Sequence, residues 1–180
     1  DEGIVAGVEI ALEIFKEVDA NLIIDVFIKD GEKVKYGDIV LIVSGHVRSI
    51  LMAERLVLNT MQRMSGIATT TKQIVEKLKG SSTQVLDTRK TTPNLRYLEK
   101  LAVKIGGGVN HRFGLYDMIL IKDNHVDYAG GIKNAIQAAQ SYIKQHQKKL
   151  QIEIEVRNIK ELEEVLACGG IDRILLDNFG

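Results

Sequence analysis

Basic and acidic side chains recur at the ends of short apolar segments in the second half of the chain. They are Arg89 and Lys90 after residues 84–88, His111 and Arg112 after a triple glycine, Lys122 after residues 118–121, Glu155 within residues 152–156, and Asp177 after residues 173–176. Arginine binds carboxylates and phosphates through two parallel hydrogen bonds, and lysine supplies a compact positive charge. Several cations in one cavity repel each other unless a polyanion neutralises them. The set therefore predicts a site for a small, multiply anionic substrate.

Glu155 and Asp177 add two carboxylates to this predicted site. Carboxylates bind a divalent metal together with phosphate oxygens, and they also accept hydrogen bonds from sugar hydroxyls. A polyanion, a metal and hydroxyl groups together suggest a phosphorylated sugar substrate. For any single residue, the alternative is an ordinary surface charge or a helix cap. Recurrence of the same residue types at the same end of successive strands favours the functional interpretation.

The elements that would position these residues alternate between strands and helices after Gly80. Strands are predicted at residues 84–88, 118–121, 152–156 and 173–176, and helices from Thr92 to the triple glycine, over residues 132–145, and from Asn158 to Gly169. Thr92 and Asn158 are the predicted N-caps, followed by Pro93 and by Glu161 in the first turns. This alternation predicts parallel strands with right-handed crossovers. No Gly-x-Gly-x-x-Gly follows a strand, so a barrel is preferred to a dinucleotide-binding sheet.

The first 80 residues follow a different pattern. The elements predicted here are a helix at residues 4–18, strands at 22–28 and 39–43, and a long amphipathic helix at 53–78. Gly31 and Gly37 supply the turn conformations of a twisted hairpin between the two strands. We therefore predict a partial N-terminal α+β domain over residues 1–80 and the first part of an α/β barrel over residues 81–180.

The expected fold class is thus α/β, an incomplete parallel α/β barrel preceded by part of a smaller α+β domain. Four strands cannot close such a barrel. The chain also has no initiator methionine, so we expect segments to be missing at both ends.

The composition excludes several classes of protein. The 24 lysines and arginines balance 24 aspartates and glutamates, so no overall charge attracts nucleic acid or an anionic membrane. No apolar run is long enough for a membrane span, and the first residues do not form a signal peptide. Cys168 is the only cysteine, which excludes an internal disulfide and predicts an inert, buried thiol. These features predict a cytoplasmic protein.

Several motifs of the chain occur together in one known family. They are Glu54–Leu56, Gln62–Thr69, Asp87–Pro93, Gly106–Arg112, Gly114–Asp117, Ile121–His125 and Leu176–Phe179. In these motifs the sequence resembles quinolinate phosphoribosyltransferase, the decarboxylating nicotinate-nucleotide pyrophosphorylase of NAD biosynthesis. The resemblance implies that quinolinate and phosphoribosyl pyrophosphate are converted into nicotinate mononucleotide, pyrophosphate and carbon dioxide, with Mg²⁺ and without an organic cofactor.

The resemblance also implies a role for each basic residue. Arg89, His111 and Arg112 are expected to bind the two carboxylates of quinolinate. Lys90 and Lys122 are expected to act as catalytic residues that face the substrate anions and the departing pyrophosphate.

The remaining roles concern the sugar, the metal and a partner subunit. Glu155 and Asp177 are also expected to be catalytic residues, which position the ribose hydroxyls and the metal. Arg55 resembles an arginine that enters the pocket from the neighbouring subunit, so a homodimer or a higher homo-oligomer is expected. Chains of the family continue through further strands and a glycine-rich loop that holds the ribose 5′-phosphate. We therefore expect the 180-residue chain alone to be inactive or nearly so.

Two other interpretations remain open. A related phosphoribosyltransferase-like protein found beside molybdate transporters shares this architecture, although the His111–Arg112 pair and Lys122 favour quinolinate. The segment Asp30–Asp38 also resembles the turn of a biotinyl or lipoyl carrier domain. Such a carrier needs an exposed lysine in its opposite hairpin, and residues 44–48 contain none. A non-enzymatic carrier module is therefore disfavoured.

Overall fold

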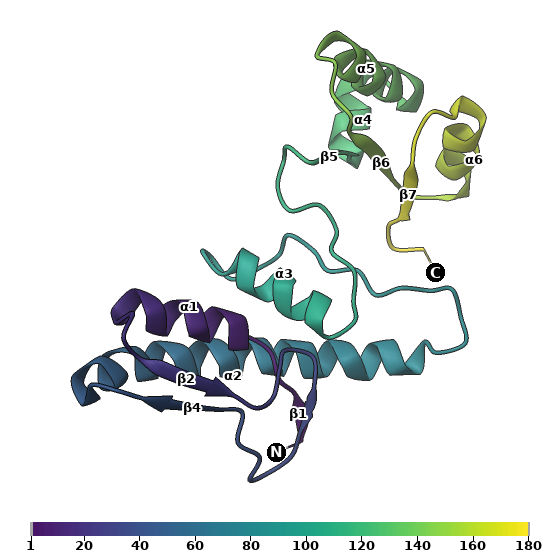
Figure 1. Cartoon of the computed structure of the whole chain (residues 1–180). Helices are drawn as coiled ribbons and strands as arrows, with labels where there is room; N and C mark the ends of the chain where they lie inside the picture. The colour runs from purple at the N-terminus through teal and green to yellow at the C-terminus, as the bar shows by residue number, and fades with distance from the viewer. Residues whose placement is uncertain (1, 180) are drawn as a thin grey trace. The chain divides into compact units, whose positions relative to one another are not determined.

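The computed structural model describes residues 2–179 of the chain (Figure 1). It contains two compact units, the first reaching to His111 and the second beginning at Arg112. The domain boundary at residue 80 stays a prediction. Each unit combines helices and strands, and the second contains a parallel sheet, so the predicted α/β fold class is confirmed.

The first unit is built around one long helix. Its elements are β1 (Gly3–Ile4), α1 (Val8–Val18), β2 (Ile23–Val26), β3 (Lys33–Val34), β4 (Leu41–Ser44), α2 (Val47–Lys77) and α3 (Arg96–Ile105). Helix α2 begins before the predicted Ala53 and buries a stripe at helical spacing, from Ala53 through Val57 and Met64 to Thr71. The first part of this stripe packs with Phe15 of α1, and the later part packs with α3.

The N-terminal segment is tied to distant parts of the first unit. The helix predicted from residue 4 is wrong at its start, because Gly7 adopts a positive φ of 97° and α1 begins at Val8. The backbone N–H of Val8 donates to Asp30 Oδ1 at 2.8 Å, which satisfies one of the free N–H groups at the helix N-terminus. Before it, the N–H of Ile4 donates to Thr69 Oγ1 on α2 at 2.8 Å.

The hairpin of the first unit agrees with the sequence. Strands β2 and β4 pair in antiparallel register, with Ile24 opposite Val43. Gly31 and Gly37, between them in the chain, have φ values of 90° and 89°. These are left-handed conformations that glycine adopts without steric cost, so the predicted turn positions are confirmed.

Helix α3 begins later than the sequence predicts. Thr92 is not its N-cap, since Leu95 occupies that position and the helix starts at Arg96. Asn94 has a φ of 64°, which interrupts the helical path after Pro93. The hydroxyl of Thr92 instead accepts a hydrogen bond from the guanidinium of Arg63 at 2.6 Å. The predicted end at the triple glycine is confirmed, because Gly106 is the C-cap.

The first predicted strand, at residues 84–88, is reduced to a single bridge. Leu86 pairs in parallel with Val109, and the N–H of Asp87 donates to the carbonyl of Val109 at 3.1 Å. The partner residue lies directly after the glycine turn, so only one pair forms and no ladder extends. Within the described residues, three of the four predicted barrel strands are therefore regular strands.

The second unit is a parallel sheet with helices. Its elements are β5 (Met118–Ile121), α4 (Asp123–Ala129), α5 (Ile132–Gln145), β6 (Gln151–Val156), α6 (Ile159–Cys168) and β7 (Arg173–Leu176), with β6 between β5 and β7. Ile152, Ile154 and Val156 of β6 are buried in a core that includes Ile136 of α5 and Val165 of α6. Side chains alternate along a strand, so Glu153 and Glu155 point to the opposite face.

Local signals at the helix ends of the second unit are mostly confirmed. Asn158 is the N-cap of α6, and its side chain accepts the N–H of Glu161 at 3.0 Å. Helix α4 is not predicted by the sequence, since its seven residues are too few to show a clear periodicity.

The thiol of Cys168 is exposed at the end of α6, so the predicted burial of this cysteine is wrong. Among the described helices, none combines the length and the apolar character that a membrane span requires.

Candidate active site

Three predicted site residues lie on adjacent strands of the second unit. Lys122 follows β5, Glu155 lies in β6, and Asp177 follows β7. The register pairs the last residues of β5 and β7 with residues of β6, and the N–H of Asp177 donates to the carbonyl of Val156 at 3.0 Å. All three residues are thus at the carboxyl ends of parallel strands, the edge at which α/β proteins place their chemistry.

Lys122 and Glu155 form an ion pair at this edge. Lys122 Nζ lies 2.9 Å from Glu155 Oε1, and the two side chains are 45% and 16% exposed. A lysine ammonium that donates to one carboxylate keeps two further N–H groups, and an anionic ligand can accept hydrogen bonds from them. Asp177 is exposed on the neighbouring strand.

His125 holds the backbone from which Lys122 projects. Its Nδ1 accepts the N–H of Lys122 at 3.0 Å, at the start of α4. The sequence left two roles open for this histidine, orientation of the loop or contact with substrate. The hydrogen bond supports the first role, since it fixes the lysine in the position that its ion pair with Glu155 uses.

Two charged residues on the same face of the sheet were missed by the sequence reasoning. Glu153 is 4% exposed, and its partner in the register of the next strand is Arg173. Parallel partners point to the same face, so both share the face of Glu155. The alternation of acidic and apolar residues in Gln151–Val156 is the sequence signal that could have found Glu153.

In the first unit, Asp87 connects two segments that carry predicted site residues. Its Oδ1 accepts the backbone N–H of His111 at 2.8 Å and the ammonium of Lys100 at 2.5 Å. Arg89 follows two residues later, and its Nε is buried without a hydrogen-bond partner. A buried guanidinium N–H without an acceptor lowers the stability of the protein, and such a group is suited to donate a hydrogen bond to a ligand. Lys90 is exposed beside it.

Arg55 lies on the exposed side of α2, away from the buried stripe of this helix. It borders a groove of about 540 Å³ that is also lined by Phe15 of α1 and by Ile39–Leu41. An exposed guanidinium at the edge of an apolar groove is available to a second molecule, as the role implied for Arg55 requires.

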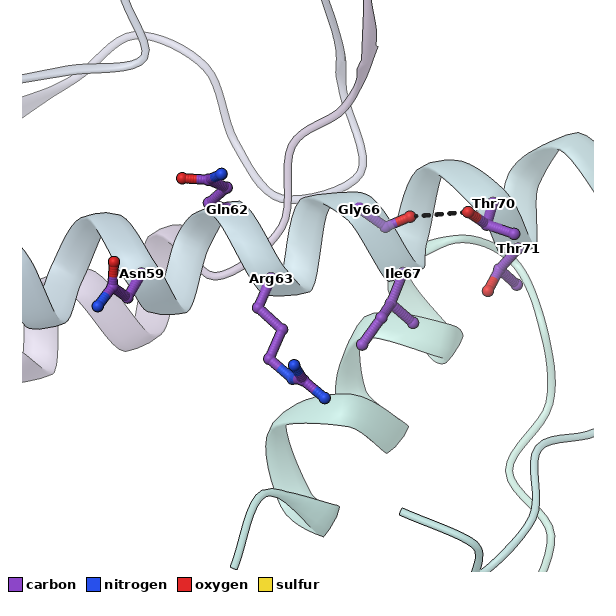
Figure 2. Close-up of a pocket in the computed structure, with 7 residues that line it drawn as sticks. All are labelled: Asn59, Gln62, Arg63, Gly66, Ile67, Thr70 and Thr71. Atoms are coloured by element: carbon purple, nitrogen blue, oxygen red, sulfur yellow. Dashed lines mark hydrogen bonds between the residues drawn. The ribbon is translucent and has the colours of Figure 1, made fainter. Parts of the chain in front are cut away.

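A second groove, of about 770 Å³, runs along α2 and contains none of the predicted site residues (Figure 2). Its lining residues are Asn59, Gln62, Arg63, Gly66, Ile67, Thr70 and Thr71. The guanidinium of Arg63 is already engaged by Glu99 and Thr92. The hydroxyl of Thr70 donates to the carbonyl of Gly66 at 3.0 Å within the helix. These two side chains are bound to the protein itself, so neither is free to bind a ligand in this groove.

The structure brings the predicted residues into two groups. Lys122, Glu155 and Asp177 lie together at one sheet edge of the second unit, and Arg89, Lys90 and His111 lie in two linked segments of the first unit. Arg112 is half-buried at the start of the second unit, and Arg55 lies apart from the first-unit group on α2. The convergence of both groups on one substrate stays a prediction. Across residues 2–179, no three His, Cys, Asp or Glu side chains gather as a metal site would require.

The fold and these residues define a class, an α/β protein whose parallel sheet carries a lysine and carboxylates at its carboxyl edge. Comparison with protein families is more specific. Residues 1–65 match the N-terminal domain of quinolinate phosphoribosyl transferase, and residues 67–180 match the C-terminal domain. The chain therefore belongs to the quinolinate phosphoribosyl transferase family.

Curated relatives with these names come from plants and from a cyanobacterium. A quinolinate phosphoribosyltransferase [decarboxylating] of Nicotiana glauca, named mitochondrial, is 45% identical over 99% of this chain and 52% of its own length. A chloroplastic nicotinate-nucleotide pyrophosphorylase [carboxylating] of Arabidopsis thaliana is 48% identical with the same coverage. A probable enzyme of the same name from Synechocystis is 39% identical over 60% of its length. The chain thus spans about half the length of the plant relatives.

Solved structures agree with the sequence comparison. The crystal structure of NadC from Streptococcus pyogenes matches with a TM-score of 0.92 and 42% sequence identity. The match covers 100% of this chain and 62% of the NadC chain. The nicotinate-nucleotide pyrophosphorylase from Francisella tularensis has a TM-score of 0.92 and 40% identity.

Proposed function

We propose that this chain is part of a phosphoribosyltransferase that joins quinolinate to phosphoribosyl pyrophosphate and releases carbon dioxide. The products are nicotinate mononucleotide, pyrophosphate and carbon dioxide, a step of NAD biosynthesis in the cytoplasm. The observation that carries the proposal is the Lys122–Glu155 pair beside Asp177, at the carboxyl edge of a sheet in a chain of this family. The buried Nε of Arg89, which has no hydrogen-bond partner, adds a group that can donate a hydrogen bond to a substrate carboxylate.

Quinolinate carries two neighbouring carboxylates, and three residues of this chain match them in charge. Arg89, His111 and Arg112 bind these carboxylates, with each arginine able to form two parallel hydrogen bonds. Binding both groups fixes the rotation of the ring and directs its nitrogen at the anomeric carbon of the sugar.

The chemical step separates charge, and the residues of the sheet edge are suited to that separation. A bond forms between the ring nitrogen and the anomeric carbon as the carbon–oxygen bond to pyrophosphate breaks. Lys122 and Lys90 neutralise the charge that builds up on the leaving pyrophosphate, while Glu155 and Asp177 favour the cationic sugar and hold its hydroxyls. The pyridinium ring then accepts the electron pair released when carbon dioxide leaves, and a proton replaces the lost group.

A divalent metal fits this site only as a substrate-borne ion. Glu155 and Asp177 provide oxygen ligands on neighbouring strands, but Glu155 also binds Lys122, and no third acidic or histidine side chain joins them among residues 2–179. Mg²⁺ is commonly bound by one or two carboxylates together with phosphates and water. When bound, it neutralises the pyrophosphate.

The active form is proposed to be a homodimer or a higher homo-oligomer in which Arg55 serves the site of the partner subunit. This arginine is exposed on α2, and the surface around it carries exposed apolar side chains, among them Leu51, Met52 and Leu56. Apolar surface of this kind on a water-exposed helix is typical of a protein interface.

The proposal is tested by release of carbon dioxide from quinolinate by the full-length protein, dependent on phosphoribosyl pyrophosphate. Arg112→Ala is expected to weaken quinolinate binding by about tenfold to a hundredfold, because one carboxylate loses its charged partner. Lys133→Ala, at an exposed position of α5, is the control and should bind quinolinate normally. A full-length protein with no affinity for quinolinate would favour the molybdate-associated relative instead.

A further inference from the structure

A buried ion pair in the first unit is linked to the segments that carry Arg89 and His111. Lys100, on α3, is 2% exposed, and the side chain of Asp87 is 7% exposed. The two charged atoms are 2.5 Å apart. Burial of two ions removes their water, and an apolar pair of similar size often gives a protein at least as stable. Stability alone therefore does not explain why these two positions are charged.

The carboxylate of Asp87 is a centre of several hydrogen bonds. Besides Lys100, Oδ1 accepts the backbone N–H of His111 at 2.8 Å. When the side-chain amide of Asn110 is oriented so that both its oxygen and its nitrogen face suitable partners, the nitrogen donates to Asp87 Oδ2 at 3.1 Å and to the carbonyl of Lys100 at 2.9 Å. The carboxylate of Asp87 thus holds both the side chain of Asn110 and the backbone N–H of His111.

The same aspartate is also bound through its main chain. Its N–H donates to the carbonyl of Val109 at 3.1 Å, and the N–H of Val109 donates to the carbonyl of Val85 at 2.8 Å. The segment that leads to Arg89 and the segment that contains His111 are therefore held in one register. The buried Nε of Arg89 remains without a partner in this arrangement.

We propose that the Asp87–Lys100 pair is a positioning pair that holds Arg89 and His111 in place for the two substrate carboxylates. This inference rests on the proposed function. Lys100 has a second effect, since it neutralises Asp87. A free aspartate two residues from Arg89 in the chain would attract that arginine and compete with the substrate. Paired with Lys100, Asp87 organises the backbone and leaves the guanidinium available.

Two double variants of the full-length protein separate positioning from stability. D87L/K100M removes both charges and the acceptor for the N–H of His111, whereas D87N/K100M removes both charges and keeps one acceptor oxygen. A11G, in the core between α1 and α2, is the control for a general loss of stability. The readouts are the Kd for quinolinate, the melting temperature, and the hydrogen exchange of the amides at residues 109–111.

D87L/K100M is expected to bind quinolinate about tenfold to a hundredfold more weakly, by analogy with the loss when hydrogen-bond partners of metal ligands are removed. Its amides at 109–111 should exchange faster, and D87N/K100M should recover part of both properties. A11G should keep the wild-type Kd and the wild-type exchange at these amides, even at a lower melting temperature.

Two results overturn the inference. One is a D87L/K100M protein that binds quinolinate as the wild type does, and the other is unchanged exchange at residues 109–111. If the wild type itself binds no quinolinate, the proposed function fails. The exchange data then still decide whether the pair fixes these two segments.

Discussion

At the residue scale, some charged pairs of the described residues face a proposed ligand site, and others brace a helix. Lys122 and Glu155 belong to the first kind. Arg157 and Glu161 belong to the second, at the start of α6, where Arg157 Nε donates to Glu161 Oε1 and the N–H of Arg157 donates to Glu161 Oε2, both at 2.8 Å. The side-chain hydrogen bond from Arg157 is the main cause of a lowered pKa for Glu161, and burial opposes it.

The lowered pKa of Glu161 predicts a pH-dependent contribution to stability. Because the folded-state pKa lies below the unfolded value, the contribution is complete above the unfolded pKa and is lost as the pH falls through the folded one. The difference in melting temperature between the wild type and Glu161→Gln should therefore be largest near neutral pH and shrink below about pH 4. Glu163→Gln, exposed on the same helix, is the control. A difference for Glu161→Gln that is constant from neutral to acid pH would contradict the prediction.

The residues at strand ends were predictable, since Lys122 and Asp177 directly follow strands that the sequence delimits correctly. The hydrogen bond from the N–H of Lys122 to His125 was not predictable, because histidine has many roles at a loop. The pairing of Lys100 with Asp87 was missed for a similar reason. A lysine in a helix is usually solvated, and only the fold shows that this one is enclosed.

At the scale of elements, the triple glycine has a packing role beyond ending α3. A Cβ atom at Gly106 would lie 2.5 Å from the carbonyl oxygen of Ala68 and 2.7 Å from Thr71 Cβ, both on α2. These distances are too short for any side chain, so the end of α3 approaches α2 as closely as backbone atoms allow.

Gly106→Ala is expected to destabilise the protein by about 1–3 kcal/mol, because α3 must move away from α2. Gly66→Ala is the matched control, since Gly66 lies in the middle of α2 and a Cβ there meets nothing within 4 Å. It should be neutral or stabilising by up to about 1 kcal/mol, the helix-propensity difference between glycine and alanine. Urea denaturation measures both values. Equal effects of the two substitutions would show that the close approach is unimportant.

The elements were predictable where one signal dominates, as in α5 and β7, and less so where tertiary contacts decide. Pro93 after Thr92 is a typical helix start, yet the left-handed Asn94 delays α3 and Arg63 takes the threonine hydroxyl. The run at residues 84–88 has strand propensity but meets only one partner residue. In both cases the local pattern is correct, and a contact distant in sequence changes the result.

At the scale of the whole molecule, the role proposed for Arg55 makes each active site depend on two subunits. Mixing two inactive full-length proteins tests this dependence. Arg55→Ala lacks the donated arginine, and Lys122→Met lacks a charge for the leaving pyrophosphate. In a mixed dimer, the subunit with intact Lys122 receives an intact Arg55 from its partner.

After unfolding and refolding of an equal mixture, about a quarter of the wild-type activity is expected to return, because half of the dimers then hold one complete site. Carbon dioxide release from quinolinate measures the recovery. Lys122→Met mixed with Glu155→Gln is the control, since both changes affect the same half of the site and leave no complete one. If Arg55 served its own subunit, no mixture would regain activity.

The ties of the N-terminal segment also govern the order in which a growing chain can fold. The N–H groups of Ile4 and Val8 need acceptors from Thr69 and Asp30, residues that the ribosome adds much later. A nascent chain that ends within α2 before Thr69 leaves the N–H of Ile4 without this acceptor. The segment around Ile4 can therefore settle only after Thr69 has been added, and until then it is open to chaperones and proteases.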